Sequence, residues 1–440
     1  MASTSTYSSG TQIQIRFVTK QEKYSVPDTP FAVPCSIASD ELNALLKELL
    51  NETSIDDSHK SVLFDFAISN VLLRQPLDKH VSEVGLSTEN VIDIEYFEKF
   101  PSPEPEDCLM HDDWVSSVHV KGNWILSGCY DNNVYLWTKK GKHILTIPGH
   151  TGAVKSVAWV SQNDTIASFV SASHDQTAML WEWNTGSNSV DCIHVCRGHE
   201  RGLESIAVDQ NAERFATGGW DSLLKVWSAS LHRTDDNSLE ESSNKKSKKT
   251  CSKSQTRTPL LTLKGHKEAI SSVQWKTSSQ LVTSSWDHTL KIWDVEYGSV
   301  ATEISGNKTF FDCHCGPKTG YLITASADRT IRLYDPKSAD GTLIKSSFLS
   351  HSEWVQTVRW SSSEENLFIS GAYDKHVKLW DTRNCKVALY ELLGHDEKVF
   401  CSDWSDAKYI VSGGADNTLR MYRTNKISQI SDKKYDNDMV

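Results

Sequence analysis

Serine or threonine, histidine and aspartate recur together along this 440-residue chain, and these residue types can form the catalytic triad of a hydrolase. Seven times a Ser or Thr is followed four residues later by Asp, and six residues after that by Trp or Tyr. In six copies a His lies 16 to 21 residues upstream of the Ser or Thr, but the fifth copy has Asn307 after Gly306. The copies are His111/Ser127/Asp131/Trp137, His150/Ser171/Asp175/Trp181, His199/Thr217/Asp221/Trp227, His266/Thr283/Asp287/Trp293, Thr324/Asp328/Tyr334, His351/Ser370/Asp374/Trp380 and His395/Ser412/Asp416/Tyr422.

The repetition favours a structural role for these residues. A catalytic constellation is needed once, whereas this one recurs seven times with an aromatic ring attached. Buried polar groups must be paired, so we expect each repeat to hold a hydrogen-bonded chain from Asp through His and Ser or Thr to the indole N–H. Tyr334 and Tyr422 would donate through a hydroxyl, and the network beside Asn307 is expected to be weaker or rewired. No other catalytic motif is found, so we predict no catalytic residue, no cofactor and no metal site of the chain's own.

The spacing of the repeats predicts the fold of residues 111–430. Successive network aspartates lie 44, 46, 66, 41, 46 and 42 residues apart, close to the roughly 40–45-residue period of WD-type propeller blades. We therefore expect a seven-bladed β-propeller in which 133–137, 224–227, 290–293 and 377–380 are third strands of their blades. The ring would close with a strand from just before His111 or from 426–430, and the sequence leaves both open.

An insert in the third blade, residues 230–258, explains the 66-residue interval. It is acidic first and basic afterwards, with almost no apolar residues, so we expect it to be disordered. Lys245, Lys246, Lys248 and Lys249 in it resemble a nuclear localisation signal, although a solvated basic loop would look the same.

Other conspicuous residues receive structural interpretations. Trp220, Trp286 and Tyr373 each precede a network Asp and are expected to edge a binding face. Cys313-His314-Cys315 and the pair Cys192 and Cys196 alternate as strand residues do, which favours core packing over metal binding.

The N-terminal residues 11–98 read as a small α+β domain with the β-β-α-β-β-β order of a ubiquitin-like β-grasp. Ser39 is expected to cap a helix whose leucines at 42, 45, 46, 49 and 50 form one apolar stripe. A short helical turn around 77–84 should end at Gly85, before a last strand at 91–97. Residues 99–110, with three prolines, read as a stiff linker, and 431–440 as a polar tail.

Charge and hydropathy limit the partners. Residues 1–110 hold 8 Lys/Arg and 18 Asp/Glu, so the head is acidic, which argues against a grip on nucleic acid and favours a cationic partner or a metal. No apolar run is long enough for a membrane span or signal peptide, so we expect a soluble intracellular chain with reduced thiols.

The motifs TQIQIRFVTK, VPDTPFAVP, FDFAISNVLLRQPL and GLSTENVIDIEY, followed by DDWVSSVHV, closely resemble one family. It is the ribosome-biogenesis WD-repeat proteins with a Notchless-like N-terminal domain, of the WD repeat-containing protein 12 type. The resemblance implies a nuclear, nucleolar and nucleoplasmic scaffold in a trimer with Pescadillo and the block-of-proliferation protein, acting on large-subunit precursors during rRNA processing. It also implies release by the AAA ATPase midasin, whose metal site binds an acidic side chain of the head.

In that family the acidic ligand lies in a G-L-S-x-E element, which here is 85–89 and ends in Glu89. A hard cation such as Mg²⁺ prefers carboxylate oxygen and often takes only one or two such ligands from protein. The resemblance therefore implies that Glu89 is a ligand, in trans, of the partner's metal ion.

A substrate receptor of a cullin-type ubiquitin ligase is the alternative. Arg383 completes a W-D-x-R pattern by which some propellers dock onto such ligases, a pattern that also arises easily by chance. Co-purification with Pescadillo and precursor rRNA, or with a cullin adaptor, would separate the two hypotheses.

Overall fold

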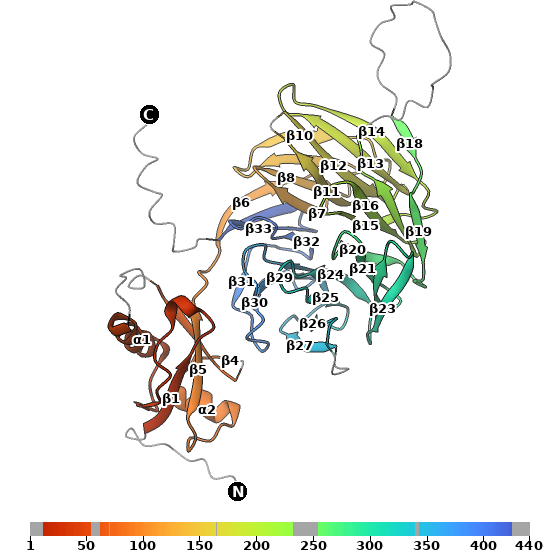
Figure 1. The fold of residues 1–440 in the computed structure, drawn as a ribbon. Helices are drawn as coiled ribbons and strands as arrows, with labels where there is room; N and C mark the ends of the chain where they lie inside the picture. Colours follow the sequence, from red (N-terminus) through yellow and green to blue (C-terminus); the bar gives the residue numbers. More distant parts are fainter. Residues whose placement is uncertain are drawn as a thin grey trace, which may run out of the picture. The chain divides into compact units, whose positions relative to one another are not determined.

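The computed structural model describes residues 12–53, 62–69, 71–163, 165–231, 254–338 and 343–424. The chain forms two compact units (Figure 1). One comprises the N-terminal residues to Ser102 with Asp381–Val387 and the C-terminal residues from Thr424, and the other comprises Pro103–Trp380 and Ala388–Arg423. Neither α-helix of the described residues is long and apolar enough to cross a membrane.

The N-terminal unit has the predicted β-grasp topology. Its elements are β1 (Gln12–Val18), the 3-10 turn η1 (Glu22–Tyr24), β2 (Phe31–Pro34), α1 (Ser39–Thr53), β3 (Phe64–Ile68), β4 (Val71–Leu72), α2 (Leu77–Val84) and β5 (Ile92–Glu98). The five strands form one sheet in the order β2-β1-β5-β3-β4, in which β1 pairs parallel with β5 and the other pairs are antiparallel. The last strand begins one residue later than predicted.

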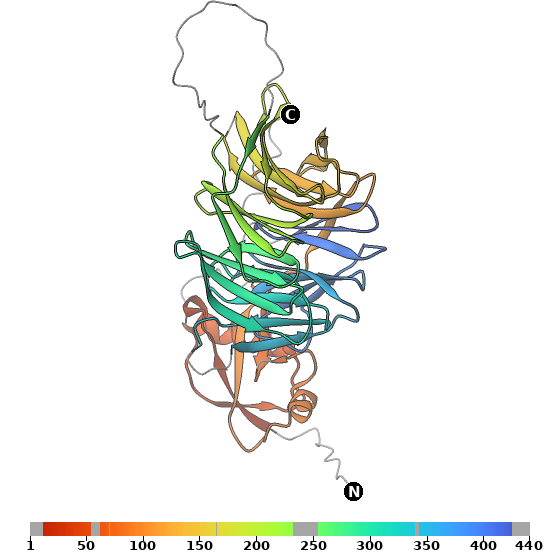
Figure 2. The same cartoon turned by 90° about the vertical axis from the view of Figure 1, so that its right-hand side faces the viewer.

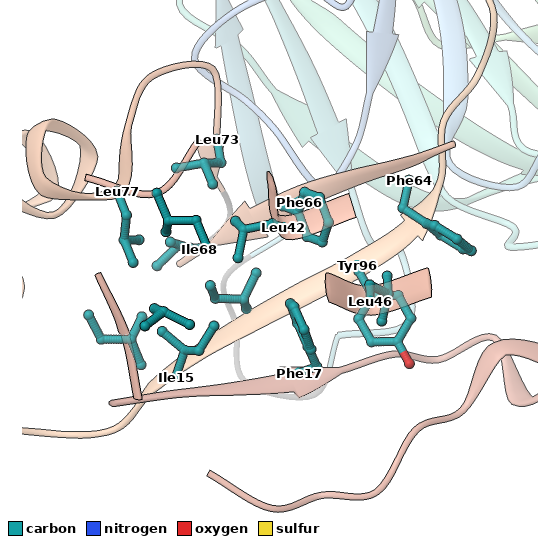
Figure 3. Packing of buried hydrophobic residues seen from close by; sticks show 14 of the residues in the cluster. Ile15, Phe17, Leu42, Leu46, Phe64, Phe66, Ile68, Leu73, Leu77 and Tyr96 are labelled. Atoms are coloured by element: carbon teal, nitrogen blue, oxygen red, sulfur yellow. The ribbon is translucent and has the colours of Figure 1, made fainter. Parts of the chain in front are cut away.

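The core of this unit lies between the sheet and α1 (Figure 3). Alternate residues of β1, Ile13, Ile15 and Phe17, are buried, as the polar–apolar alternation predicts. Leu42 and Leu46 of α1 are fully buried against them. The helix includes Ser39 instead of being capped by it, because the backbone N–H of Ala38 is satisfied by the Glu41 carboxylate at 3.1 Å. The prediction of Ser39 as the N-cap is therefore wrong by one position.

The second unit consists of seven sheets, which are the predicted propeller blades (Figure 2). Six of them have four antiparallel strands, and the sheet of blade two has a fifth strand that pairs parallel at its edge. Blades one and two contain β7 (Val115–Lys121), β8 (Trp124–Cys129), β9 (Val134–Thr138), β10 (His143–Ile147), β11 (Val154–Gln162), β12 (Ile166–Ser173), β13 (Thr177–Asn184) and β14 (Ser189–Arg197). Blades three and four contain β15 (Leu203–Val208), β16 (Arg214–Gly219), β17 (Leu223–Ser228), β19 (Leu261–Lys264), β20 (Ile270–Trp275), β21 (Gln280–Ser285), β22 (Thr289–Asp294) and β23 (Ser299–Ser305). Blades five to seven contain β24 (Phe310–Cys315), β25 (Leu322–Ser326), β26 (Thr330–Tyr334), β27 (Ile344–Leu349), β28 (Val355–Trp360), β29 (Leu367–Ala372), β30 (Val377–Asp381), β31 (Tyr390–Leu392), β32 (Val399–Asp403), β33 (Tyr409–Gly414) and β34 (Thr418–Arg423).

The first strand of each blade faces the axis of the ring. These strands contact one another in the closed sequence β7, β11, β15, β20, β24, β28, β32 and back to β7. Clusters of buried apolar side chains span neighbouring blades, such as the cluster of Val154 and Trp159 with Leu126 and Leu136. A blade cannot bury both faces alone, so the closed ring is what completes the core.

The ring is closed by one of the two strands that the sequence left open. Residues of the predicted linker 99–110 form β6 (Glu104–Met110), which pairs antiparallel with β34 as the outer strand of blade seven. In Figure 1 the orange β6 accordingly lies beside the blue strands of that blade. The strand before His111 therefore closes the propeller, the prediction of a linker is wrong for these seven residues, and 426–440 lie outside the described residues.

The last part of the insert in blade three forms a short strand. Gln255–Arg257 form β18, which pairs parallel with β14 at the outer edge of blade two. Arg257 donates to the carbonyls of Ser228 and Ser230 at 2.7 and 2.9 Å and to His194 Nε2 at 2.8 Å. The expectation of disorder over 230–258 is therefore wrong for its last residues, because backbone pairing and this arginine replace apolar burial. Residues 232–253 lie outside the described part of the chain.

Candidate functional site

Four blades contain the complete hydrogen-bonded chain. In blade four, His266 joins Asp287 Oδ2 through Nδ1 at 2.8 Å and Thr283 Oγ1 through Nε2 at 2.7 Å. The indole N–H of Trp293 donates to the same Thr283 oxygen at 2.8 Å. The other complete sets are His150, Asp175, Ser171 and Trp181 in blade two, His199, Asp221, Thr217 and Trp227 in blade three, and His351, Asp374, Ser370 and Trp380 in blade six.

The tryptophans of these networks are packed inside the blades and do not belong to a binding site. Trp181 is 4% exposed and stacks on Phe169 with ring centroids 6.1 Å apart, and its indole N–H donates to Ser171 Oγ at 2.8 Å. Trp227 is 0% exposed and stacks on Phe215 at 6.3 Å, and its indole N–H donates to Thr217 Oγ1 at 2.8 Å. Neither Trp181 nor Trp227 is among the residues that line the two cavities described below. Trp181 and Trp227 therefore serve to hold the blade together.

These networks tie together two loops at one end of each blade. Asp287 Oδ1 accepts from the backbone N–H of Thr289 in the turn between the second and third strands, at 2.9 Å. Asp287 Oδ2 accepts from the backbone N–H of Lys267, directly after the network histidine, at 2.9 Å. The residue after the network aspartate has a positive φ in every blade, from 60° to 74°. No glycine occupies any of these seven positions, and only Asn132 and Asn417 are of a residue type that adopts the left-handed backbone readily.

The pKa of the network aspartate and the pKa values of the network histidines described here are all lowered, for different reasons. Burial alone would raise the pKa of Asp287, but hydrogen bonds from His266 and Thr289 more than offset this, so its pKa lies below the ordinary value. Burial lowers the pKa of His199 and of His351 despite their aspartate partners. The aspartates are therefore anionic at neutral pH, and the histidines named here are held closer to the neutral form.

Blades one and seven depart partly from this pattern. His111 and Trp137 both reach Ser127 Oγ, at 2.8 and 3.3 Å, but Asp131 accepts from the Tyr135 hydroxyl instead of from His111. In blade seven His395 joins Asp416 and Ser412, whereas the Tyr422 hydroxyl donates to the Leu393 carbonyl at 3.3 Å. The predicted four-member chain is therefore wrong for blade one, because Tyr135 competes for the aspartate.

Blade five, without the histidine, is rewired. Asp328 forms an ion pair with Arg332 at 2.5 Å. Thr324 Oγ1 is buried, and no hydrogen-bond partner is found for it among the described residues. This blade therefore stabilises its turn by an ion pair instead of by a chain through histidine.

The aromatic residues before the network aspartates line the mouth of the central channel, in keeping with their predicted place at the edge of a binding face. The channel has a volume of about 1040 Å³, and Trp220, Trp286 and Tyr373 are among its lining residues. The ring centroids of Trp220 and Trp286 lie 5.5 Å apart, and those of Tyr373 and Phe400 lie 5.9 Å apart. The mouth therefore presents partly exposed aromatic surface to a partner.

One buried ion pair fixes this mouth. Lys155 Nζ lies 3.0 Å from Glu204 Oε1, and the Trp220 indole N–H donates to Glu204 Oε2 at 2.9 Å. Burial alone would raise the pKa of Glu204, but Lys155 and the hydrogen bonds of His174 and Trp220 lower it to about 2. Sequence reasoning missed Lys155 and Glu204, since they occupy the same strand position in different blades with opposite charges.

Glu89 lies in an exposed turn between α2 and β5, well defined by its neighbours. Gly85 ends α2 in the left-handed conformation at φ 73°, and Leu86 packs partly against the core of the N-terminal unit. The Ser87 hydroxyl accepts from the backbone N–H of Glu89 at 3.3 Å. Among the described residues, no ion pair or side-chain hydrogen bond engages the Glu89 carboxylate. Its oxygens are therefore available to a ligand outside this unit.

The remaining candidates fall in three places. Lys245, Lys246, Lys248 and Lys249 lie outside the described residues. The Arg383 guanidinium is held by Asp381, with Nε 2.9 Å from Oδ1 and Nη2 2.5 Å from Oδ2. Cys313 and His314 lie on β24, where Cys313 is buried and His314 Nδ1 accepts from the Trp360 backbone N–H.

Two family models match the chain. The NLE (NUC135) domain matches residues 13–81. The WD domain, G-beta repeat, matches seven segments, which are 105–138, 141–182, 190–228, 257–294, 298–335, 341–381 and 386–423. The first of these segments includes β6, in agreement with its place in the ring.

The chain is also similar to curated proteins along most of its length. It is 52% identical over 415 residues to a Drosophila virilis protein described as "Ribosome biogenesis protein WDR12 homolog", which covers 94% of this chain and 96% of that protein. Proteins with the same description from Drosophila yakuba and Aedes aegypti are 51% identical over 415 residues and 49% identical over 413 residues, with the same coverage.

Proposed function

This chain belongs to the WDR12 family of ribosome biogenesis proteins, and from that premise we propose that it is a non-catalytic assembly factor for the large, 60S, ribosomal subunit. In this proposal it is a scaffold in a complex with Pescadillo and the block-of-proliferation protein, needed for pre-rRNA processing in the nucleolus and nucleoplasm. The AAA ATPase midasin then releases it from the pre-ribosomal particle through the ubiquitin-like domain.

The state of the network hydroxyls supports a scaffold. Ser171, Thr217, Thr283 and Ser370 are 0% exposed, and each joins a histidine and a tryptophan at once. A hydrolase nucleophile must reach its substrate, whereas these oxygens are enclosed by their own blades. Their role is to hold loops at the channel mouth, where a partner can bind.

The Glu89 carboxylate is the observation that carries the midasin proposal. It is exposed, is engaged by no described side chain, and projects from a turn that Gly85 and Leu86 hold in place. A Mg²⁺ ion in the partner's adhesion site could complete its coordination with this one oxygen ligand, since Mg²⁺ is commonly bound through one or two carboxylates. The rigidity of the turn lowers the ordering cost of that contact.

The proposal is tested with Glu89→Gln, which removes the charge and keeps the size of the side chain. Loss of a metal ligand should weaken binding of the midasin adhesion domain by about 100-fold or more in Mg²⁺, while thermal unfolding and Pescadillo co-purification stay unchanged. Asn90→Ala, an exposed neighbour without a carboxylate, is the control and should bind normally. Binding is measured by calorimetry and release by ATP-dependent loss from purified pre-ribosomal particles; normal release of the Glu89→Gln protein would refute the role.

A further inference from the structure

The end of the propeller channel opposite the aromatic mouth, here called its lower half, carries polar groups that the scaffold function does not use. The first strands of blades one, five, six and seven contribute four residues to this part of the channel wall, which are His119, His314, Arg359 and Asp403. A second cavity of about 460 Å³ opens beneath them, and His314, Arg359 and Asp403 line both cavities. Such a volume is typical of small-molecule pockets.

Hydrogen bonds between neighbouring blades fix the tautomer of the two histidines. His119 Nδ1 accepts from the backbone N–H of Trp159 at 3.0 Å, and His314 Nδ1 accepts from that of Trp360 at 3.1 Å. A neutral imidazole that accepts through Nδ1 must carry its proton on Nε2. Burial lowers the pKa of both histidines, and with repulsion from Arg359 and His119 it lowers that of His314 to about 3. Each ring is therefore neutral at physiological pH and offers one N–H donor.

The charges of the lower cavity are mostly positive. Lys276, Lys318, Lys337 and Arg359 line it, against Asp403 as the one carboxylate among its lining residues. That carboxylate is already engaged, because Asp403 Oδ2 accepts from the Val120 backbone N–H at 2.7 Å and from the Ser405 hydroxyl at 2.6 Å. Arg359 is paired with Asp312, whereas no described carboxylate pairs with Lys276 or Lys337.

A residue in the wall of this cavity carries a buried donor without a partner in the described part of the chain. Trp360 lines the lower cavity and is 3% exposed, and its indole N–H has no hydrogen-bond partner among the described residues. Leaving such a group unsatisfied costs about 1–3 kcal/mol, so native structures seldom retain one without a reason. The five indoles of the repeat networks, by contrast, all donate to a Ser or Thr oxygen.

We propose that this lower cavity, on the face opposite the aromatic mouth, binds a small phosphate-bearing polyanion. Lysine ammonium groups, a guanidinium and neutral N–H donors together match the several acceptor oxygens of phosphate. The surplus of cations supplies the attraction, and the imidazole N–H of His314 supplies direction. Bound there, the anion would connect blades four, five and six, to which Lys276, Lys337 and Trp360 belong.

The test uses the full-length chain and sodium pyrophosphate, with binding followed by calorimetry at physiological ionic strength without divalent cations. We expect saturable binding at one site, and the double variant Lys276→Gln/Lys337→Gln should bind about 100-fold more weakly, about tenfold per lost cation. Lys142→Gln/Lys267→Gln removes the same charge from exposed lysines elsewhere on the propeller and should bind as the unmodified protein does.

Three results would overturn the proposal. The first is an absence of saturable pyrophosphate binding, and the second is equal weakening by both double variants, which would assign the binding to overall charge. The third is a single-stranded RNA of about ten nucleotides that prevents pyrophosphate binding and itself binds more weakly to the Lys276→Gln/Lys337→Gln protein, which would assign the cations to nucleic acid instead. Both lysines of the test pair lie in surface turns, so a folding defect is not expected, and matched thermal unfolding curves check this.

Discussion

The pKa of a network histidine depends on what holds its Nδ1 atom. In blade three Asp221 accepts from His199 and opposes the effect of burial on that histidine's pKa. In blade one Asp131 is engaged by Tyr135, His111 Nδ1 has no hydrogen-bond partner among the described residues, and burial lowers the pKa of His111 to about 4. Burial therefore lowers the pKa of the histidine in both blades, and in blade one no hydrogen bond from the network aspartate opposes it.

His111 should make the stability of the propeller depend on pH. Its pKa is lower in the folded protein than the ordinary 6.5, so the unfolded chain binds more protons, and stability is lost as the pH falls from about 6.5 towards 4. This one group should remove about 2 kcal/mol of the free energy of unfolding between pH 7.5 and pH 5.0. Urea unfolding at both pH values measures the loss.

The matched variants isolate the contribution of His111 from those of other buried histidines. His111→Gln keeps a donor for Ser127 but does not titrate, so its loss of stability on acidification should be smaller than that of the unmodified protein by about 2 kcal/mol. His288→Gln, at an exposed turn, should leave the pH dependence unchanged. Equal pH dependence in all three proteins would show that His111 titrates normally in the fold.

At the scale of the element, β6 and β18 show what sequence patterns leave out. Only one of the seven residues of β6, Leu109, is buried, so the strand has no polar–apolar alternation to detect. Its place is set by backbone pairing with β34, more than 300 residues away. The three residues of β18 are likewise held by pairing with β14 and by Arg257. Strands with a buried stripe, such as β1, were predictable because burial dictates their composition.

The contribution of β6 to the stability of the propeller can be measured with a substitution at Leu109. Its side chain is 3% exposed within the cluster that joins blades seven and one, so Leu109→Ala should lower the free energy of unfolding by about 2–4 kcal/mol. Cys108→Ala, at the exposed neighbouring position of the same strand, should change it by about 0.5 kcal/mol or less. Denaturant unfolding of both proteins distinguishes a seated strand from a linker, for which both changes would be small.

At the scale of the whole molecule, the regular spacing of the repeats made the two-unit architecture predictable, and it also concealed the differences between blades. The channel residues His119, His314 and Arg359 occupy the same strand position in three different blades. This position is not restricted to one residue type. An alignment of the repeats would therefore show this position only as a variable one, without indicating a shared role. Only the ring, which brings the first strands of all blades together, shows that they line one cavity. The role of Glu89 came from the resemblance, because an exposed turn carries no pattern.

The N-terminal unit should fold without the propeller. Its twenty-residue buried cluster draws on β1, β2, β3, β5 and both helices, with Phe17, Phe64 and Tyr96 in edge-to-face contact at 5.6 and 5.9 Å. We therefore expect a fragment of residues 1–102 to unfold cooperatively on heating and to give dispersed amide NMR signals. Phe66→Ala should cost about 3–5 kcal/mol in that fragment, whereas Glu22→Ala at the exposed η1 turn should cost little. A fragment without a cooperative transition would contradict this.

Closure of the ring by β6 also means that the propeller cannot be completed until the end of the chain has been synthesised. The five strands and two α-helices of the N-terminal unit have all been made after about a hundred residues, and β6 follows them directly. Its partner β34 is more than 300 residues further on, which at typical translation speeds is a wait of roughly 15 to 60 s. Throughout that wait the nascent chain carries a finished head and an unpaired strand beside it. A ribosome that stops short of residue 418 therefore leaves every blade made so far in an open ring, a substrate for chaperones and proteases whatever the quality of its individual repeats.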